Sequence, residues 1–106
     1  QIARNGWIAD YNDPCSFLDM WYTDGGNNDA QYSNPDYDAA IDAAKATSDP
    51  AERMKAFHEA EDILIGQDSV LAPIYFYTQP YMLNPDIDGM YYTPLGYFFF
   101  GYTSKK

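Results

Sequence analysis

The feature that most constrains this chain is a repeated helix-start signal, an Asp or Asn followed directly by proline. One such pair, Asn84-Pro85, lies in a stretch with the composition of an irregular loop, and the three pairs that precede an apolar stripe are Asp13-Pro14, Asn34-Pro35 and Asp49-Pro50. In each of these three pairs the first side chain can accept a hydrogen bond from a backbone N–H, and the proline has no N–H to leave unsatisfied. Each of the three therefore predicts a helix whose first position is the proline.

The predicted helices differ in length and in the apolar stripe that each carries. The first is short and runs into the polar loop 23–29; the second extends to about Thr47; the third ends at Gly66 and has Glu52 at the capping-box spacing from Asp49. The last two are joined by a very short turn and should form a helical hairpin. The predicted buried positions are Phe17, Leu18 and Trp21 in the first helix, Tyr37, Ile41 and Ala44 in the second, and Met54, Phe57, Ala60 and Leu64 in the third.

Two further segments have the pattern of β-strands. Residues 1–11 alternate weakly, with Gly6 allowing another backbone to approach, and residues 69–78 are rich in β-branched and aromatic side chains. Residues 79–96 have the composition of an irregular loop, 97–102 predict a last short strand, and the tail is expected to fray. Two well-formed strands are too few for an independent sheet. The order of elements thus predicts an α/β fragment whose remaining strands belong to a longer protein.

The composition excludes several classes of function. Sixteen acidic residues against six basic ones give a net charge of −10, which argues against nucleic acid because phosphate binding needs clustered Lys and Arg. Cys15 is the single cysteine, so no internal disulfide and no cysteine-based metal site can form. No metal-ligand spacing is present, and we expect no cofactor.

The acidic residues near the N-terminus are the main candidates for a site. Asp10 and Asp13 could form the paired carboxylates of a glycosidase, but Asp13 is better explained as a helix cap. Asp10 has no such duty and lies at the C-terminal end of the predicted strand, where α/β folds place ligand sites. Cys15 and His58 offer no convincing nucleophile pair. We therefore predict no catalytic residues and no enzyme.

The motifs of this chain resemble those of one protein family. R-x-G-W-x-A-D-Y-N-x-P at 4–14, Y-x-N-P-x-Y-D at 32–38, A-x-x-x-A-E-x-I-L at 56–64 and D-S-x-x-x-P-I-Y-x-Y at 68–77 follow one another in the order and spacing of the bacterial oligopeptide-binding proteins. These are extracytoplasmic solute-binding proteins of ABC importers, in the peptide- and nickel-binding class. The likeness weakens toward the C-terminus.

The resemblance implies a C-terminal fragment of a two-lobed, type II periplasmic-binding-protein-like fold. Residues 1–77 would belong to the distal ligand-binding lobe, and 78–106 would cross the hinge and return to the N-terminal lobe. The implied function is extracytoplasmic capture of short peptides, with a membrane permease as partner. The protein would be periplasmic or lipid-anchored on the outer face of the cell membrane.

The resemblance also implies roles for individual residues. Asp10 matches the acid that binds the α-ammonium group of the peptide, and Trp7 matches a tryptophan near a side-chain pocket. Gly6 and Ile8 match positions whose backbone pairs with the extended peptide. Arg4 matches a basic residue that approaches the carboxylate end of some peptides.

Other interpretations stay open at this point. The chain could be a carbohydrate-active or carbohydrate-binding domain, a binder of a non-peptide ligand within the same family, or an independent interaction domain with an aromatic contact surface. For the fragment we also expect exposed apolar surface that promotes self-association.

Overall fold

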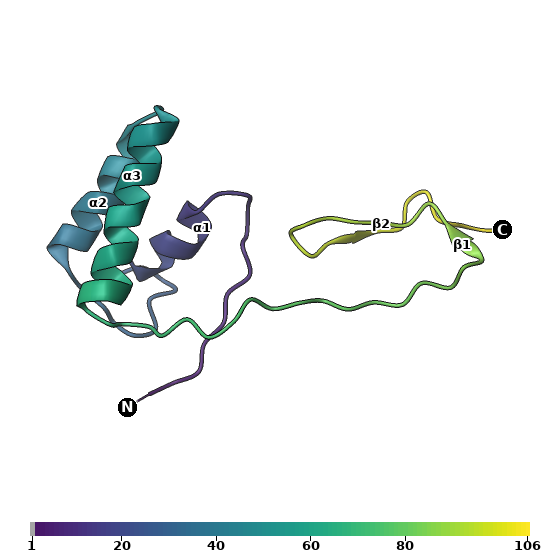
Figure 1. Ribbon diagram of the computed structural model, residues 1–106, viewed down its shortest axis with the longest axis horizontal. Coiled ribbons are helices and arrows are strands. Elements are labelled where there is room, and N and C mark those ends of the chain that lie inside the picture. Colours follow the sequence, from purple (N-terminus) through teal and green to yellow (C-terminus); the bar gives the residue numbers. More distant parts are fainter. Residues whose placement is uncertain (1) are drawn as a thin grey trace. The chain divides into compact units, whose positions relative to one another are not determined.

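The computed structural model describes residues 2–106 and divides the chain into two compact units (Figure 1). The first unit ends at Pro73 and holds the helices, and the second is Ile74–Lys106. No helix of the described residues is both long enough and apolar enough to cross a membrane.

The first helical segment is shorter and tighter than predicted. It consists of α1 (Cys15–Leu18) and the 3₁₀ helix η1 (Asp19–Trp21). Leu18 and Trp21 pack against the core as expected, but Phe17 is 46% exposed, and Cys15 and Met20 are buried instead. The prediction failed for Phe17 because the chain tightens to about three residues per turn after Leu18, so a stripe drawn at 3.6-residue spacing does not apply.

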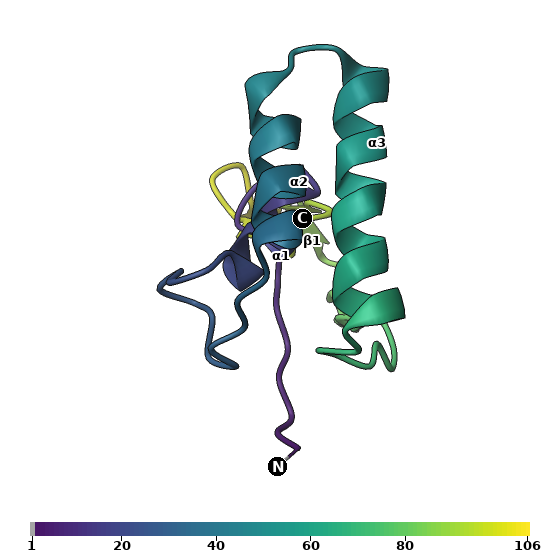
Figure 2. The same cartoon turned by 90° about the vertical axis from the view of Figure 1, so that its left-hand side faces the viewer.

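Helices α2 (Pro35–Ala46) and α3 (Pro50–Glu61) form the predicted helical hairpin (Figure 2). Asn34 caps α2 by accepting the N–H of Asp36 at 2.9 Å, and Asp49 caps α3 by accepting the N–H groups of Ala51 and Glu52, both at 2.9 Å. The reciprocal bond of the predicted capping box, from the Asp49 N–H to the Glu52 carboxylate, does not form. The Glu52 carboxylate accepts the Thr47 hydroxyl at 3.1 Å, leaving the Asp49 N–H to the same threonine.

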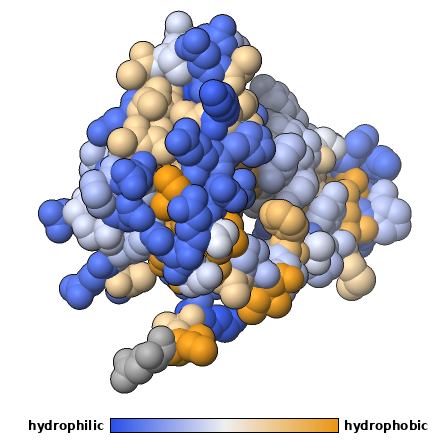
Figure 3. Space-filling view, turned by 60° about the vertical axis from the view of Figure 1, so that its left-hand side comes forward, coloured by the Kyte–Doolittle hydropathy of each residue, from blue (hydrophilic) through white to orange (hydrophobic). Residues whose placement is uncertain are grey.

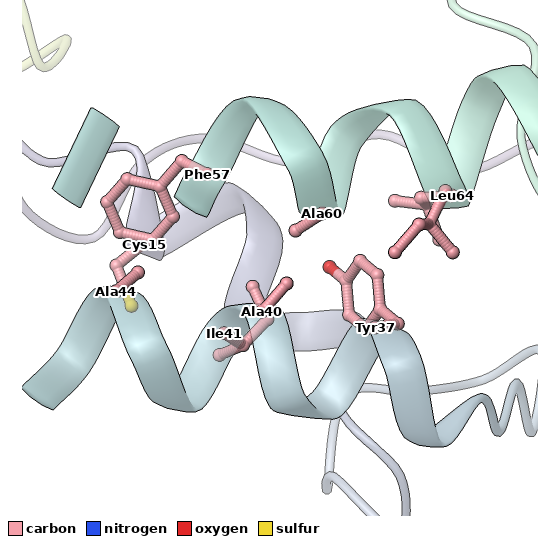
Figure 4. Packing of buried hydrophobic residues seen from close by; sticks show 9 residues of the cluster. Cys15, Tyr37, Ala40, Ile41, Ala44, Phe57, Ala60 and Leu64 are labelled. Atoms are coloured by element: carbon pink, nitrogen blue, oxygen red, sulfur yellow. The ribbon is translucent and has the colours of Figure 1, made fainter. Parts of the chain in front are cut away.

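The core lies between the two long helices and α1 (Figure 4). All predicted stripe positions of α2 are buried, and so are Phe57, Ala60 and Leu64. Met54 is 42% exposed and is a wrong prediction. It lies one turn before Phe57, where Arg53 covers the Phe57 ring at 4.7 Å from its centroid. The buried cluster comprises Cys15, Tyr37, Ala40, Ile41, Ala44, Phe57, Ala60, Ile63 and Leu64.

The third helix does not end at Gly66. It passes into a π-helical segment, η2 (Asp62–Gln67), which contains Gly66. The chain turns away at Ser69, which has a φ of 51°. The helix end was misplaced because the side chain at the left-handed position is serine, a residue that seldom adopts this conformation.

The two segments predicted as the main strands form no strands. Residues 2–9 and 70–78 have no regular secondary structure, the chain bends at 10–11 and 69, and none of these residues pairs with another described residue in a sheet. Ile2, Ile8, Ile74 and Phe76 are exposed. A strand satisfies its backbone groups only through a neighbouring strand, and the described chain supplies none for these segments.

The second unit consists of two short antiparallel ribbons. Strand β1 (Ile87–Asp88) pairs with β4 (Ser104–Lys105), and β2 (Tyr91–Tyr92) pairs with β3 (Phe98–Phe99). The strand predicted in 97–102 is confirmed, whereas 79–96 are more regular than expected and the tail is paired rather than frayed. Gly89, which directly follows β1, allows the close approach of the chain that leads into β4. Its φ is 77°, and an added Cβ would lie 2.0 Å from the Tyr102 carbonyl oxygen.

Apolar side chains lie at the surface of both units. Figure 3 shows one face, where orange apolar side chains lie among blue hydrophilic ones. Many of the exposed apolar residues belong to the stretch after Pro73, where Ile74, Phe76 and Met82 are among the most accessible.

Candidate functional site

Trp7 and Asp10, both predicted as site residues, line one pocket in the first unit. Its volume is about 330 Å³. The N-terminal segment supplies Trp7, Asp10 and Tyr11, and the loop supplies Gly25, Gly26 and Asn27. The other lining residues come from α1, η1 and the residue that follows: Cys15, Ser16, Asp19, Met20 and Tyr22. The pocket is thus built from three consecutive stretches of chain.

Asp10 is held through its backbone while its side chain stays available. Its N–H donates to the Ser16 hydroxyl at 2.8 Å. Its side chain is exposed and makes no hydrogen bond or ion pair with any described residue. The pocket therefore presents one carboxylate that is ready to meet a donor or a positive charge.

Asp13 has a different situation, although it is only three residues away. Both of its carboxylate oxygens accept from the Arg53 guanidinium, at 2.6 and 2.8 Å, and Oδ1 also accepts the Cys15 N–H at 2.9 Å. The hydrogen bonds from Arg53 hold the pKa of this carboxyl below its usual value. The Asp13 carboxylate thus accepts the N–H of the first residue of α1, although α1 begins at Cys15 with Pro14 as its N-cap, one residue later than predicted. Because it is already paired, it is a poor second acid for a glycosidase.

Trp7 and Tyr11 give the pocket its aromatic wall. The indole nitrogen of Trp7 is buried and has no acceptor among the described residues. The pKa of Tyr11 is raised to about 12, first by its side-chain hydrogen bond with Cys15 and then by desolvation. The phenol is therefore protonated at neutral pH and acts as a hydrogen-bonding group rather than a base.

The loop that lines the pocket is ordered around the buried Asn28. Its amide nitrogen donates to the carbonyl oxygens of Tyr22 at 3.1 Å and Tyr32 at 2.7 Å, and its oxygen accepts the Tyr32 N–H at 3.0 Å. Asp24 and Gln31 adopt left-handed φ values of 59° and 53° in the same loop. The segment was expected to be an irregular polar loop, but one buried amide closes it at both ends.

Side chains also anchor this loop to the helices. The Thr23 N–H donates to Asp38 at 3.0 Å. Asp68, just after η2, accepts from the Tyr32 hydroxyl and the Asn34 amide, both at 2.7 Å, and these bonds lower the pKa of its carboxyl. The loop is therefore fixed to the first turn of α2 and to the residue that follows η2, at the open end of the helical hairpin.

The other predicted binding residues do not line the pocket. Ile8 has a 73% exposed side chain, and Arg4 and Gly6 are also exposed. The Gly6 N–H donates to the Asn5 side chain at 2.7 Å. The backbone of residues 5–9 makes no backbone–backbone hydrogen bond with described residues, so this part of the chain is open to an incoming strand.

Sequence reasoning missed Ser16, Tyr11 and the loop wall as parts of the site. For the loop, a usable signal was Asn28 among small and polar residues, because a buried Asn side chain often replaces backbone partners in turns. Ser16 and Arg53 gave no local signal, since their partners lie 6 and 40 residues away.

No group of three metal-ligating side chains lies together among the described residues. Cys15 is buried in the core, and His58 lies on the exposed side of α3. Cys15 also lines the pocket that holds Asp10, but the one histidine that could activate its thiol, His58, does not line the pocket.

Comparison with known proteins connects this pocket to a family. The periplasmic oligopeptide-binding protein OppA of Haemophilus influenzae is 40% identical over 88 residues, which cover 83% of this chain. The dipeptide-binding protein DppE of Bacillus subtilis is 34% identical over 97 residues, or 92% of the chain. Over this length the chain belongs to the bacterial oligopeptide-binding proteins. No protein-family model matches it.

The match covers only part of these relatives. The chain spans 16% of the Haemophilus protein and 18% of the Bacillus protein. A crystal structure of the peptide-binding protein of a peptide ABC transporter matches 61% of this chain and 30% of its own, with a TM-score of 0.56 and 36% identity. The chain therefore has the fold of a fragment of a type II periplasmic binding protein, as predicted.

Proposed function

We propose that these residues form part of a binding lobe that captures short peptides outside the cell for an ABC importer. The unpaired Asp10 carboxylate beside Trp7 carries this proposal. A carboxylate that a closing cleft removes from water needs a positive partner, because desolvating it alone is prohibitive. The α-ammonium group of a peptide supplies that charge. The similarity to an oligopeptide-binding and a dipeptide-binding protein supports the same ligand class.

The backbone of residues 5–9, which makes no backbone–backbone hydrogen bond with described residues, supplies the second part of the proposed site. Gly6 and Ile8 would pair their N–H and C=O groups with the extended ligand, as in strand addition. This mode recognises the peptide through its backbone groups, so it suits ligands of varied sequence. The Gly6 N–H must first leave the Asn5 side chain, a surface hydrogen bond that costs little to exchange.

Trp7 and Arg4 complete the proposed contacts. Trp7 lies in the pocket next to Asp10 and would pack against the side chain of the first ligand residues. Arg4, six residues before Asp10 on the extended segment, would approach the carboxylate end of some peptides. We propose binding without chemistry, because Asp13, the nearest other acid of the turn, is held by Arg53.

The proposal extends to the whole protein. Residues 1–77 would belong to the distal lobe and 78–106 would return to the other lobe, with the ligand enclosed by hinge closure. The protein would be extracytoplasmic, either periplasmic or lipid-anchored. Its second partner would be the membrane permease. The similarity to periplasmic oligopeptide-binding proteins supports this location.

The exposed apolar surface after Pro73 suits such a fragment. Ile74, Phe76 and Met82 would be covered by the remainder of the protein, and the isolated 106-residue chain would self-associate through them. Sedimentation over a range of concentrations tests this. A monodisperse species that binds no hydrophobic dye would contradict it.

Calorimetric titration of the full-length protein that carries these residues tests the function. Trialanine should bind, and its N-acetylated form should bind far more weakly. Asp10→Asn should cost about 2–5 kcal/mol of trialanine binding, the range for breaking a buried charge pair. Asp29→Asn, at an exposed acid of the loop, is the matched control.

Each outcome of the titration has a clear meaning. Equal binding of both peptides would remove the role of Asp10. Binding of neither peptide, with tight binding of a sugar or another ligand class, would overturn peptide capture.

A further inference from the structure

We propose that Arg53 is a positioning residue for Asp10. Its guanidinium forms a bidentate ion pair with the Asp13 carboxylate, and this pair fixes the turn that carries the ligand-binding carboxylate of Asp10. This inference rests on the proposed function, because it concerns the same site. Arg53 lies on α3, far from Asp10 in the sequence, and does not line the pocket. It acts through Asp13.

The turn from Asp10 to Ser16 is closed by hydrogen bonds that meet at Asp13. The Asp10 N–H donates to the Ser16 hydroxyl at 2.8 Å, and the Ser16 N–H donates to the Asp13 carbonyl oxygen at 3.1 Å. The Asp13 side chain accepts the Cys15 N–H at 2.9 Å. A displacement of Asp13 therefore moves Ser16 and, through it, the backbone of Asp10.

Arg53 is well placed to prevent that displacement. Its two terminal nitrogens bind the two oxygens of Asp13, at 2.6 and 2.8 Å, and this geometry fixes direction as well as distance. The guanidinium also lies over the ring of Phe57, 4.7 Å from its centroid, and Phe57 is buried in the core. The turn is thus tied to a side chain of the buried core cluster of the first unit.

The same contact separates the roles of two neighbouring acids. Among the described residues, the ion pair with Arg53 is the one that neutralises an acid of this turn. Asp13 is satisfied by it, so Asp10 remains the single carboxylate of the turn that is free for a ligand cation. Without Arg53, Asp13 would be a second unpaired acid that competes for the ammonium group and displaces it from its place beside Trp7.

The experiment compares trialanine with N-acetyl-trialanine on the full-length protein that carries these residues. Arg53→Gln should weaken binding of the free-amine peptide by roughly tenfold, as is typical when an outer group that holds a binding residue is lost. Binding of the acetylated peptide should stay unchanged, so the ratio of the two affinities falls by the same factor. Arg53→Lys keeps the positive charge but cannot form the bidentate contact, so its affinity ratio should lie between those of Arg53→Gln and the wild type.

Lys55→Gln is the matched control, with the same change of charge on an exposed position of the same helix. It should leave the ratio as in the wild type. Asp13→Asn is the second variant, because the asparagine oxygen can still accept the Cys15 N–H while the charge pair is lost. It keeps the test valid if Arg53→Gln does not fold.

The result separates this inference from the proposed function. A wild-type protein that does not distinguish the two peptides overturns the proposed function itself. A wild type that does distinguish them, with the ratio unchanged in Arg53→Gln and Asp13→Asn, overturns the positioning role alone. So does an equal loss for both peptides, which would mark a general structural effect.

Discussion

The two units of this chain satisfy their backbones in different ways. In the first unit, the hairpin of α2 and α3 pairs its N–H and C=O groups within each helix and buries side chains such as Tyr37 and Ile41 completely. In the second unit, pairing is limited to two ribbons with two residues in each strand, and Tyr97, Phe100 and Tyr102 stay exposed.

The difference shows what a short stretch of chain can complete alone. A helix needs only local partners, and its apolar stripe can be covered by a neighbouring helix that follows at once. A strand needs another strand, and aromatic side chains on a narrow ribbon have too little surface to pack against. We therefore expect stability to be concentrated in the first unit.

The largest expected effect tests this contrast with one substitution at two positions. Leu64→Ala, at a side chain that is 1% exposed, should destabilise the 106-residue chain by about 2–5 kcal/mol through lost burial and the cavity left behind. Leu83→Ala, at a side chain that is 45% exposed, should change the free energy of unfolding by less than about 0.5 kcal/mol. Urea unfolding followed by helical circular dichroism measures both. Equal costs would break the comparison.

A second substitution asks whether the pocket loop shares the stability of the first unit. Asn28→Ala removes a buried amide with three hydrogen bonds to Tyr22 and Tyr32. It should cost about 1–3 kcal/mol, because the backbone groups of the loop lose their partners. Amide hydrogen exchange across residues 22–34 should become faster. Asn27→Ala, at an exposed neighbour, should leave exchange unchanged, and a similar effect of both variants would argue against the role of Asn28.

A third substitution concerns the second unit. Gly89→Ala should break the pairing of β1 with β4, because the new Cβ would lie 2.0 Å from the Tyr102 carbonyl oxygen at a φ that disfavours side chains. The cost should exceed about 1 kcal/mol. Nuclear Overhauser contacts between Ile87 and Lys105 report the pairing. Gly101→Ala, where no atom lies within 4 Å of the new Cβ, should preserve those contacts.

The smallest expected effect is a pH dependence in the first unit. The pKa of Asp68 is lowered in the folded state by hydrogen bonds from Tyr32 and Asn34. A lowered folded-state pKa adds stability above the unfolded pKa, and this stability is lost as the pH falls through the folded pKa. Asp68→Asn should therefore flatten the fall of the urea midpoint between roughly pH 5 and pH 2. The variant Asp29→Asn should keep the wild-type slope, and an unchanged slope in Asp68→Asn would contradict the assignment.

The parts of the fold that follow from local rules could be predicted from the sequence. Asn34-Pro35 and Asp49-Pro50 fixed the starts of α2 and α3, and the apolar spacing identified Tyr37, Ile41 and Leu64 as core. The predictions failed where the outcome depends on distant residues. The strand patterns at 2–11 and 69–78 have no partner in the described chain, and the tail pairs with Ile87–Asp88 across a long loop.

The candidate site shows the same division. Asp10 and Trp7 could be found from the family motif, and the structure places both in one pocket. That Asp13 is held by Arg53 while Asp10 stays open could not be found, because the distinction depends on a residue 40 positions away on another helix. The order of the loop around Asn28 depends on burial, which composition does not reveal.

The turn between α2 and α3 has a consequence for the time course of folding. Ala46 and Pro50 are separated only by residues 47–49, so the hairpin closes with almost no loss of loop entropy. Such local contacts form within microseconds to milliseconds, whereas pairings between distant strands are slower. The hairpin should thus be the first part to fold. The turn that holds Asp10 would then form against the folded hairpin when Arg53 pairs with Asp13, so the Asp10 carboxylate reaches its place late.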